Sequence, residues 1–189
     1  MYLEEGDPWK VGSSWYEQRK IAVALACLAD PSYDRVLDPA CGTGHLARAV
    51  AERSGVVVAK DASAPAVEIA RRVCESVENV NIDVAALPYA FGETAGPFDL
   101  IVLSEFLYYL DNDARARSID SVLERAADRA EVIAVHWRDS PEDGTASGED
   151  VHAELRNYFK AKGFRHQVAH FDEEFVIDDF TRGHDQHIE

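Results

Sequence analysis

The apolar positions along the chain follow two alternating spacings, and this alternation predicts the order of its secondary-structure elements. Apolar residues three or four positions apart are typical of a helix that packs one face on a core, whereas short continuous apolar runs are typical of buried strands. Helices are predicted over residues 16–28, 44–53, 64–77, 113–127 and 149–161. Strands are predicted over residues 35–38, 56–60, 79–83, 98–104, 131–137, 164–171 and 174–181.

This order of elements predicts the fold class. Strands that alternate with helices form a parallel sheet with helices on both faces, because each crossover passes over one face of the sheet. The last two strands are joined by a tight turn, so we expect them to pair antiparallel. We therefore expect one α/β domain over residues 1–189, with a doubly wound, mainly parallel seven-stranded sheet and an antiparallel C-terminal strand pair. Residues 138–148, rich in Gly, Ser, Asp and Pro, are expected to form a flexible loop.

Composition limits the partners that the chain is expected to have. The 189 residues, 47% of them hydrophobic, suffice for one globular core. A formal net charge of −16 would repel nucleic acid, whereas a neutral or cationic small molecule is easily accommodated. The three cysteines form no paired motif, so neither a disulfide framework nor a zinc site is predicted. No apolar segment reaches membrane-spanning length and the start is acidic, so we expect a cytoplasmic monomer or homodimer without membrane contact.

The stretch RVLDPACGTGHLARAVAERSG, residues 35–55, predicts a ligand site. A buried strand ends at Asp38, and Gly42 and Gly44 form the turn into the next helix. In doubly wound sheets the ligand lies outside the carboxyl ends of the strands, and glycines in the first turn let the backbone approach it. With Ala47, these glycines also match the dinucleotide fingerprint GxGxxG/A, so an NAD enzyme is an alternative. The chain has no room for the catalytic domain that a dehydrogenase needs.

Two further acidic residues follow the next two predicted strands. Asp61 stands where a carboxylate can bind both hydroxyls of a ribose, and Asp83 stands where one can bind an adenine amino group. Each of them alone is equally well explained as a solvated acid at a strand end or a helix start. Their common register with Asp38, Gly42 and Gly44 predicts a site that holds a nucleoside.

These segments resemble a known family in the order of its motifs. VLDPACGTGHL, VVVAKDAS, NIDVAALP and FDLIVLSEFLYYL resemble the four successive motifs of class I S-adenosylmethionine-dependent methyltransferases. DPWKVGSSWYEQRK, SEFLYYL, VHWR and GEDVH are similar to the branch around nodulation protein S (NodS). Ala40 departs from the usual glycine, and ADRAE replaces the usual glycine pair before the fifth strand. DPACGTG also resembles adenine-specific DNA methyltransferases, but Ser104-Glu105-Phe106-Leu107 stands where those need an Asn-Pro-Pro-Tyr motif.

The resemblance implies that S-adenosylmethionine is the cofactor and S-adenosylhomocysteine the product. Gly42 and Gly44 would pass close to its methionine part, and Asp61 would hold the ribose. The helical segment 1–30 would close over the cofactor. Further cofactor contacts are implied by the resemblance or expected beside it. They are Tyr16 and Arg19 near the carboxylate, Ala62, Asp83 and Val84 around the adenine, and Asp38, Ala40 and Ser104 along the strand ends.

Methyl transfer to an amine needs a group that holds the ammonium and accepts its proton. Glu105, directly after the fourth strand, is the best candidate, and His136, at the end of the fifth, is the next. Either residue is also explained without catalysis: Glu105 as the start of a helical turn, His136 as a core histidine. The residues expected to contact the acceptor are Trp9, Tyr108, Tyr109, Trp137, Arg138 and His152.

Histidine positions elsewhere predict no metal site. His152 is expected either at the surface or on a lid formed by the preceding loop, and His166 and His170 are expected on one solvent-facing side of a strand. The function expected is N-methylation of an amino sugar or a natural-product amine. O-methylation with His136 as the base, or a cofactor-binding module without catalysis, are the alternatives.

Overall fold

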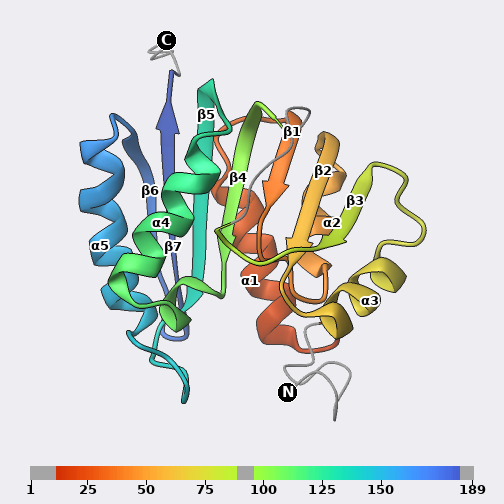
Figure 1. Cartoon of the computed structure of the whole chain (residues 1–189), viewed down its shortest axis with the longest axis horizontal. Coiled ribbons are helices and arrows are strands. Elements are labelled where there is room, and N and C mark those ends of the chain that lie inside the picture. Colours follow the sequence, from red (N-terminus) through yellow and green to blue (C-terminus); the bar gives the residue numbers. More distant parts are fainter. Residues whose placement is uncertain (1–11, 89–95, 184–189) are drawn as a thin grey trace.

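The computed structural model of the protein describes residues 12–88 and 96–183 (Figure 1). The helices are α1 (Trp15–Cys27), α2 (His45–Ala51), α3 (Ala64–Val73), the short 3-10 turn η1 (Leu107–Tyr109), α4 (Asn112–Leu123) and α5 (Gly148–Ala161). The strands are β1 (Tyr33–Asp38), β2 (Ser54–Asp61), β3 (Val80–Val84), β4 (Phe98–Ser104), β5 (Ala126–Trp137), β6 (Arg165–Phe171) and β7 (Phe175–Arg182). None of these helices combines the length and apolar content that spanning a bilayer requires.

The seven strands form one sheet in the order β3-β2-β1-β4-β5-β7-β6. β1 to β5 are parallel, and β7 runs antiparallel between β5 and β6 (Figure 1). This confirms the predicted doubly wound sheet with its antiparallel strand pair. The strand order reverses between β1 and β4, so the carboxyl ends of these two strands flank the switch point at which such sheets bind ligands.

Two separate apolar cores cover the two faces of the sheet. Helices α1, α2 and α3 pack on one face, where Val36 and Leu100 are fully buried. Helices α4 and α5 pack on the other face, where Leu37 and Ile101 are fully buried. Adjacent strand residues therefore serve opposite cores, as the alternation of side chains along a strand requires. This is why the buried strands read as continuous apolar runs in the sequence.

Three element boundaries differ from the prediction by four residues or more. α3 ends at Val73 instead of residue 77, and α4 ends at Leu123 instead of residue 127. β5 begins at Ala126, earlier than the predicted residue 131, and its first residue pairs with Phe98 across an irregular register. Alanine and arginine favour helix locally, but pairing with β4 overrides this preference in residues 126–130.

The prediction for His166 and His170 was wrong. A register irregularity between His166 and Val168 inserts an extra residue into β6, and such a bulge reverses the side on which the following side chains lie. His166 stacks on Phe180 on the α5 face of the sheet, whereas His170 stacks on Phe175 on the α1 face. The two histidines therefore do not share a solvent-facing side.

Candidate active site

The turn between β1 and α2 is shaped by its glycines. Gly42 and Gly44 have φ angles of 52° and 79°, a region that glycine enters without steric cost. A Cβ atom at Gly44 would lie 2.8 Å from the Cβ atom of Ala70 on α3. The Cys41 N–H donates to the Lys60 carbonyl at 2.8 Å, which fixes the turn to the end of β2. The backbone here is thus held open towards the strand ends.

Asp61, at the end of β2, supports this turn and keeps capacity for a ligand. Its Oδ2 accepts a hydrogen bond from the Gly42 N–H at 2.9 Å, and its Oδ1 accepts one from the Ser63 N–H at 2.8 Å. A carboxylate oxygen has two lone pairs, so each oxygen can accept one more donor. Two hydroxyl groups on neighbouring carbons are the donors that such a pair of oxygens suits.

Asp38 is a buried carboxyl group with too few partners. The residue is 1% exposed, and its Oδ1 has no hydrogen-bond partner within residues 12–88 and 96–183. Burial raises the pKa of Asp38 to about 7, against the lowering effect of a hydrogen bond from the Ala40 N–H, and nearby Asp61 adds to the rise. The Tyr16 hydroxyl is likewise buried without a partner among the described residues, and burial raises its pKa. Unsatisfied buried polar atoms at a strand end are expected where a polar ligand binds.

The expected adenine contacts lie at an open rim. Ala62 and Asp83 are exposed, and the side chain of Asp83 lies 3.9 Å from the Lys60 ammonium group through its Oδ2. Val84 is 50% exposed, which is unusual for a valine and leaves an apolar surface beside the polar groups. The structure thus brings these three residues to the same edge of the sheet as Asp61.

Glu105 follows β4 directly and is held by three donors. Its Oε1 accepts from the Lys20 ammonium group at 2.5 Å, and its Oε2 accepts from the Trp137 N–H at 3.0 Å and from the Tyr108 hydroxyl. Glu105 has a φ of 58°, a left-handed conformation that costs energy for a residue with a Cβ atom. The side chain is 28% exposed. A strained, partly exposed carboxylate at the switch point has the placement of a reactive group.

Lys20 is the member of this cluster that the sequence did not reveal. The residue is 4% exposed, its Nζ lies 3.0 Å from Glu17 Oε1, and it stands 4.7 Å from the ring centre of Tyr16. Burial disfavours the charged lysine, but the carboxylates of Glu105 and Glu17 outweigh burial and raise its pKa overall. The one available signal was its position four residues after Tyr16, which places both side chains on one face of the helix.

Arg19 points elsewhere, although it lies on the same helix. Its guanidinium group forms an ion pair with Asp172, in the turn between β6 and β7, and its Cζ lies 5.1 Å from the ring centre of Phe175. A contact between Arg19 and a cofactor carboxylate would require this ion pair to open. The structure therefore links Tyr16 to Glu105 through Lys20 and places Arg19 at the start of β7.

The two histidines expected near the acceptor are fully buried. His136 and His152 are both 0% exposed, so the expected surface or lid position of His152 was wrong. The reason is that Asp178 on β7 offers His152 a buried hydrogen-bond partner at 2.7 Å. Tyr109 and Trp137, each 37% exposed, and Arg138, whose Nε lies 3.2 Å from Glu149, form the outer wall instead. Trp9 lies outside the described residues.

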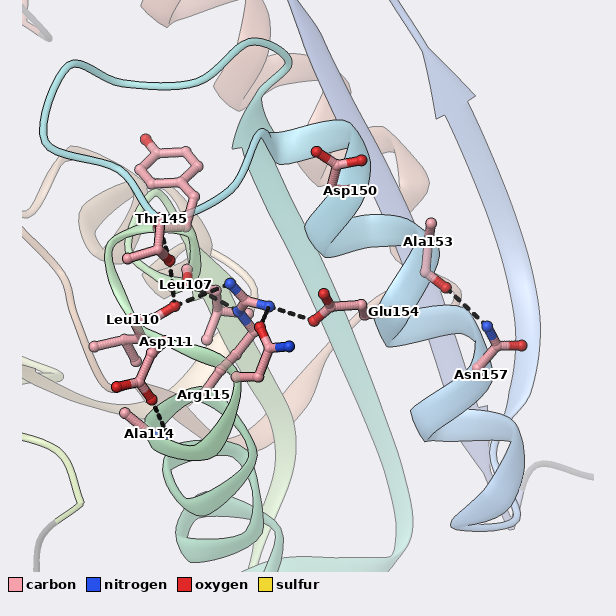
Figure 2. A network of polar contacts seen from close by, with 12 residues as sticks. Leu107, Leu110, Asp111, Ala114, Arg115, Thr145, Asp150, Ala153, Glu154 and Asn157 are labelled. Carbon is pink, nitrogen blue, oxygen red and sulfur yellow. Dashed lines mark hydrogen bonds and ion pairs between the residues drawn. The ribbon is translucent and has the colours of Figure 1, made fainter.

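Polar contacts between α4, η1 and α5 fix the turn that carries Tyr108. Arg115 donates to the carbonyl groups of Leu107 at 3.0 Å and Leu110 at 2.9 Å, and it forms an ion pair with Glu154 of α5 (Figure 2). Thr145, in the loop before α5, donates to the Leu110 carbonyl at 2.6 Å. The loop at 138–148 is therefore attached to η1 at Thr145, and its flexibility stays a prediction.

Similarity to known proteins shows to which protein family this chain belongs. A candidate methyltransferase from Pseudomonas syringae is 34% identical over 89% of this chain and all of its own length, with a TM-score of 0.76. A methyltransferase domain family matches residues 36–128. The chain belongs to the class I S-adenosylmethionine-dependent methyltransferases.

Two further solved structures share the fold at lower identity. The N-methyltransferase NodS from Bradyrhizobium japonicum WM9, in complex with S-adenosyl-L-homocysteine, has a TM-score of 0.81 and 20% identity, covering 96% of this chain and 95% of its own. The DhpI–SAH complex has a TM-score of 0.74 and 21% identity, covering 97% and 93%. The methyltransferase therefore keeps the family fold over almost its whole length.

S-adenosylmethionine is the cofactor of this methyltransferase. The residues at the strand ends fit it: the glycine turn allows close approach, Asp61 has acceptor capacity for hydroxyl groups, and the buried oxygens of Asp38 and Tyr16 offer polar contacts. Within the described ranges, no group of three or more His, Cys, Asp or Glu side chains is arranged to hold a metal ion.

Proposed function

We propose that this methyltransferase methylates the amino group of a small molecule, an amino sugar or a natural-product amine, and that Glu105 accepts the amine's proton. The observation that carries the proposal is the arrangement of donors around Glu105. A carboxylate has about four lone-pair sites, and Lys20, Tyr108 and Trp137 occupy three of them within the described residues. One site remains on Oε1. The aromatic ring beside it is that of Tyr16, which already contacts the ammonium group of Lys20.

The cofactor contacts proposed for this chain follow from the same strand ends. Gly42 and Gly44 would lie along the methionine part, and Asp61 would bind the ribose hydroxyls. Asp38 Oδ1, which has no partner among the described residues, is an acceptor available to the cofactor's ammonium group, since a carboxyl with a raised pKa gains most from a nearby cation. Further contacts proposed around the cofactor are those of Tyr16 in segment 1–30, Ala40, Ser104, and Ala62, Asp83 and Val84 at the adenine.

The bound cofactor supplies a methyl group on a positively charged sulfur, which leaves as a neutral thioether. The protein's part is to place the acceptor nitrogen in line with the breaking bond, which is worth up to about 7–11 kcal/mol when the geometry is right. The amine loses one proton as its new carbon–nitrogen bond forms, and Glu105 takes that proton. General base catalysis of this kind contributes about 10²–10⁴-fold. Positioning therefore contributes more than proton transfer.

The acceptor would lie against the outer wall of the site. Tyr109 and Trp137 present partly exposed aromatic faces there, which suit the apolar side of a sugar ring or a protonated amine. Arg138 is tied to Glu149 at the exposed edge of the same wall. The solved neighbour NodS is described as an N-methyltransferase, which supports the choice of nitrogen over oxygen.

O-methylation with His136 as the base is less well supported. His136 is 0% exposed, and both of its ring nitrogens have partners: His152 on Nδ1 and the Leu107 N–H on Nε2. A base must reach the proton that it removes. His136 would have to leave two hydrogen bonds before it could do so.

Product identification tests the proposal. The protein would be incubated with methyl-labelled S-adenosylmethionine and a panel of amino sugars, chitooligosaccharides and aminoglycoside-like compounds, each paired with its hydroxyl analogue in which the amino group is replaced. We expect labelled product, identified by mass spectrometry, from amine members and none from their hydroxyl partners. Methylation of the hydroxyl analogues at an equal rate would overturn the proposal.

A further inference from the structure

A chain of buried polar side chains runs from behind Glu105 through α5 to β7. His136 Nδ1, on β5, lies 3.0 Å from His152 Nε2, on α5, and His152 Nδ1 lies 2.7 Å from Asp178 Oδ2, on β7. All three residues are 0% exposed. We refer to His136, His152 and Asp178 as the histidine relay.

The partners of the relay determine where its protons lie. The Leu107 N–H donates to His136 Nε2 at 3.4 Å, so the proton of His136 lies on Nδ1 and is donated to His152. His152 then carries its proton on Nδ1 and donates it to Asp178. Burial lowers the pKa of His136 well below its usual value, and it lowers the pKa of His152 despite the hydrogen bond to Asp178. Both rings are therefore neutral, with every ring nitrogen engaged.

His136 lies beneath two of the three groups that hold Glu105. The ring of Tyr108 packs edge-to-face on the ring of His136, with their centres 5.2 Å apart, and the Tyr108 hydroxyl donates to Glu105 Oε2. Trp137, the next residue after His136, donates its N–H to the same oxygen at 3.0 Å. A rotation of the His136 ring would displace Tyr108, and a shift of its backbone would displace Trp137.

We infer that the histidine relay positions the Glu105 carboxylate and that neither of its histidines exchanges a proton with the acceptor. The catalytic consequence rests on the proposed function, whereas the structural coupling between His152 and Glu105 does not. His136 and His152 are then positioning residues. Burying two imidazoles and a carboxylate is costly unless all their hydrogen bonds are made, and these bonds allow the relay a single arrangement.

His166, which contacts Asp178 from the more exposed side, provides a matched control. His166 Nε2 lies 2.5 Å from Asp178 Oδ1, so it contacts the same carboxylate as His152 but from a side chain that is 34% exposed. His166→Gln removes an imidazole–carboxylate contact on the outer side, and His152→Asn removes the link to His136 on the inner side. Asparagine places its amide near the former Nδ1 and can still bond Asp178, but it cannot reach His136.

Heteronuclear NMR of the full-length protein tests the structural part of the inference. In the wild type near neutral pH, we expect both buried imidazoles to be neutral and protonated on Nδ1. In His152→Asn, the backbone amide resonances of Leu107 and Trp137 and the carboxyl carbon resonance of Glu105 should shift, while His166→Gln leaves them in place. A cationic or Nε2-protonated ring in the wild type would overturn the inference, as would unshifted resonances in folded His152→Asn. If this variant does not fold, the tautomers of the two rings in the wild type decide.

A double-mutant cycle tests the catalytic part with an amine acceptor from the panel. His152→Asn should lower kcat by up to about 10²-fold, the effect of a small misplacement, with the KM for the cofactor unchanged. In the Glu105→Gln background the same change should have little further effect, because the relay acts through Glu105. Losses that multiply independently would contradict this. Full activity of Glu105→Gln would instead remove the proposed function, while the NMR result would still decide the coupling.

Discussion

Asp38 and Asp178 are both buried carboxyl groups, but their surroundings give them opposite properties. Asp178 accepts hydrogen bonds from His152, Arg156 and His166, and although burial acts to raise its pKa, the bonds from His152 and Arg156 lower it below the usual value. Asp38 has one oxygen without a partner among the described residues, and burial raises its pKa to about 7. The partners of Asp178 make it part of the framework, whereas the unpartnered oxygen of Asp38 lies at the strand end where the cofactor is proposed to bind and is available to it.

The largest effect is expected from removing the satisfied acid. Asp178→Ala leaves the buried His152 and the partly exposed Arg156 without their shared carboxylate, and each hydrogen bond to a charged acceptor lost in this way costs about 1.5–3 kcal/mol. Urea unfolding measures the loss in the free energy of unfolding. A loss no larger than that of the exposed control Asp150→Ala would show that the partners of Asp178 contribute little.

Removing the unsatisfied acid should have the opposite sign. Because its pKa is raised on folding, the folded state binds the Asp38 proton more tightly, and Asp38 costs stability as pH rises from about 4 through about 7. Without cofactor, Asp38→Asn should therefore be more stable than the wild type, by a margin that grows over this range by at most about 1.4 kcal/mol per pH unit and then levels off. Unfolding midpoints measured at several pH values give the margin. A margin that does not change with pH would contradict the difference from Asp178.

Asp61 is an intermediate case, since its oxygens are engaged but have acceptor capacity left. Asp61→Ala should weaken cofactor binding by about 1.5–3 kcal/mol, the loss expected for hydrogen bonds to a charged acceptor, while the protein stays folded. Isothermal titration with S-adenosylhomocysteine measures the affinity. Unchanged affinity in the folded variant would remove the proposed ribose contact.

The smallest effect is expected from chelation. Asp38 and Asp61 are neighbouring acids. A divalent cation bound between them is the competing explanation for the unsatisfied carboxyl group of Asp38. We expect methyl transfer and the unfolding midpoint to be unchanged by EDTA. Activity lost with EDTA and restored by magnesium would indicate a metal-assisted O-methyltransferase instead.

The sequence predicted the arrangement of the proposed cofactor residues better than that of the proposed acceptor residues. Asp38, Gly42, Gly44 and Asp61 lie within one strand–turn–helix–strand unit, so their spacing along the chain nearly determines their arrangement in space. Lys20 and Glu105 are separated by 85 positions, and their contact depends on how α1 docks on the sheet. A lysine on an amphipathic helix is usually solvated, so no local pattern marks Lys20 as buried.

The errors have the same physical origin. His152 was expected at the surface because its partner Asp178 belongs to another strand, and only the packing of α5 on β7 brings them together. The bulge in β6 that separates His166 from His170 has no signature in the alternation of residues around it. The contact of Arg19 with the cofactor stays a prediction, and its helical spacing from Tyr16 gave no sign of the ion pair with Asp172 in the turn between β6 and β7.

The role of Glu105 is tested by exchanging its charge while keeping its shape. With an amine acceptor, Glu105→Gln should lower kcat by roughly 10²-fold or more, with cofactor affinity nearly unchanged, because the lost interaction acts on the acceptor in the transition state. Glu68→Gln, an exposed change on α3, is the control for the loss of one charge. The rate of the wild type should rise with pH towards the pKa of the amine, and the variant should need a higher pH to approach it. Near wild-type activity of Glu105→Gln, together with an inactive His136→Asn, would contradict the assignment and favour a histidine base acting on an oxygen acceptor.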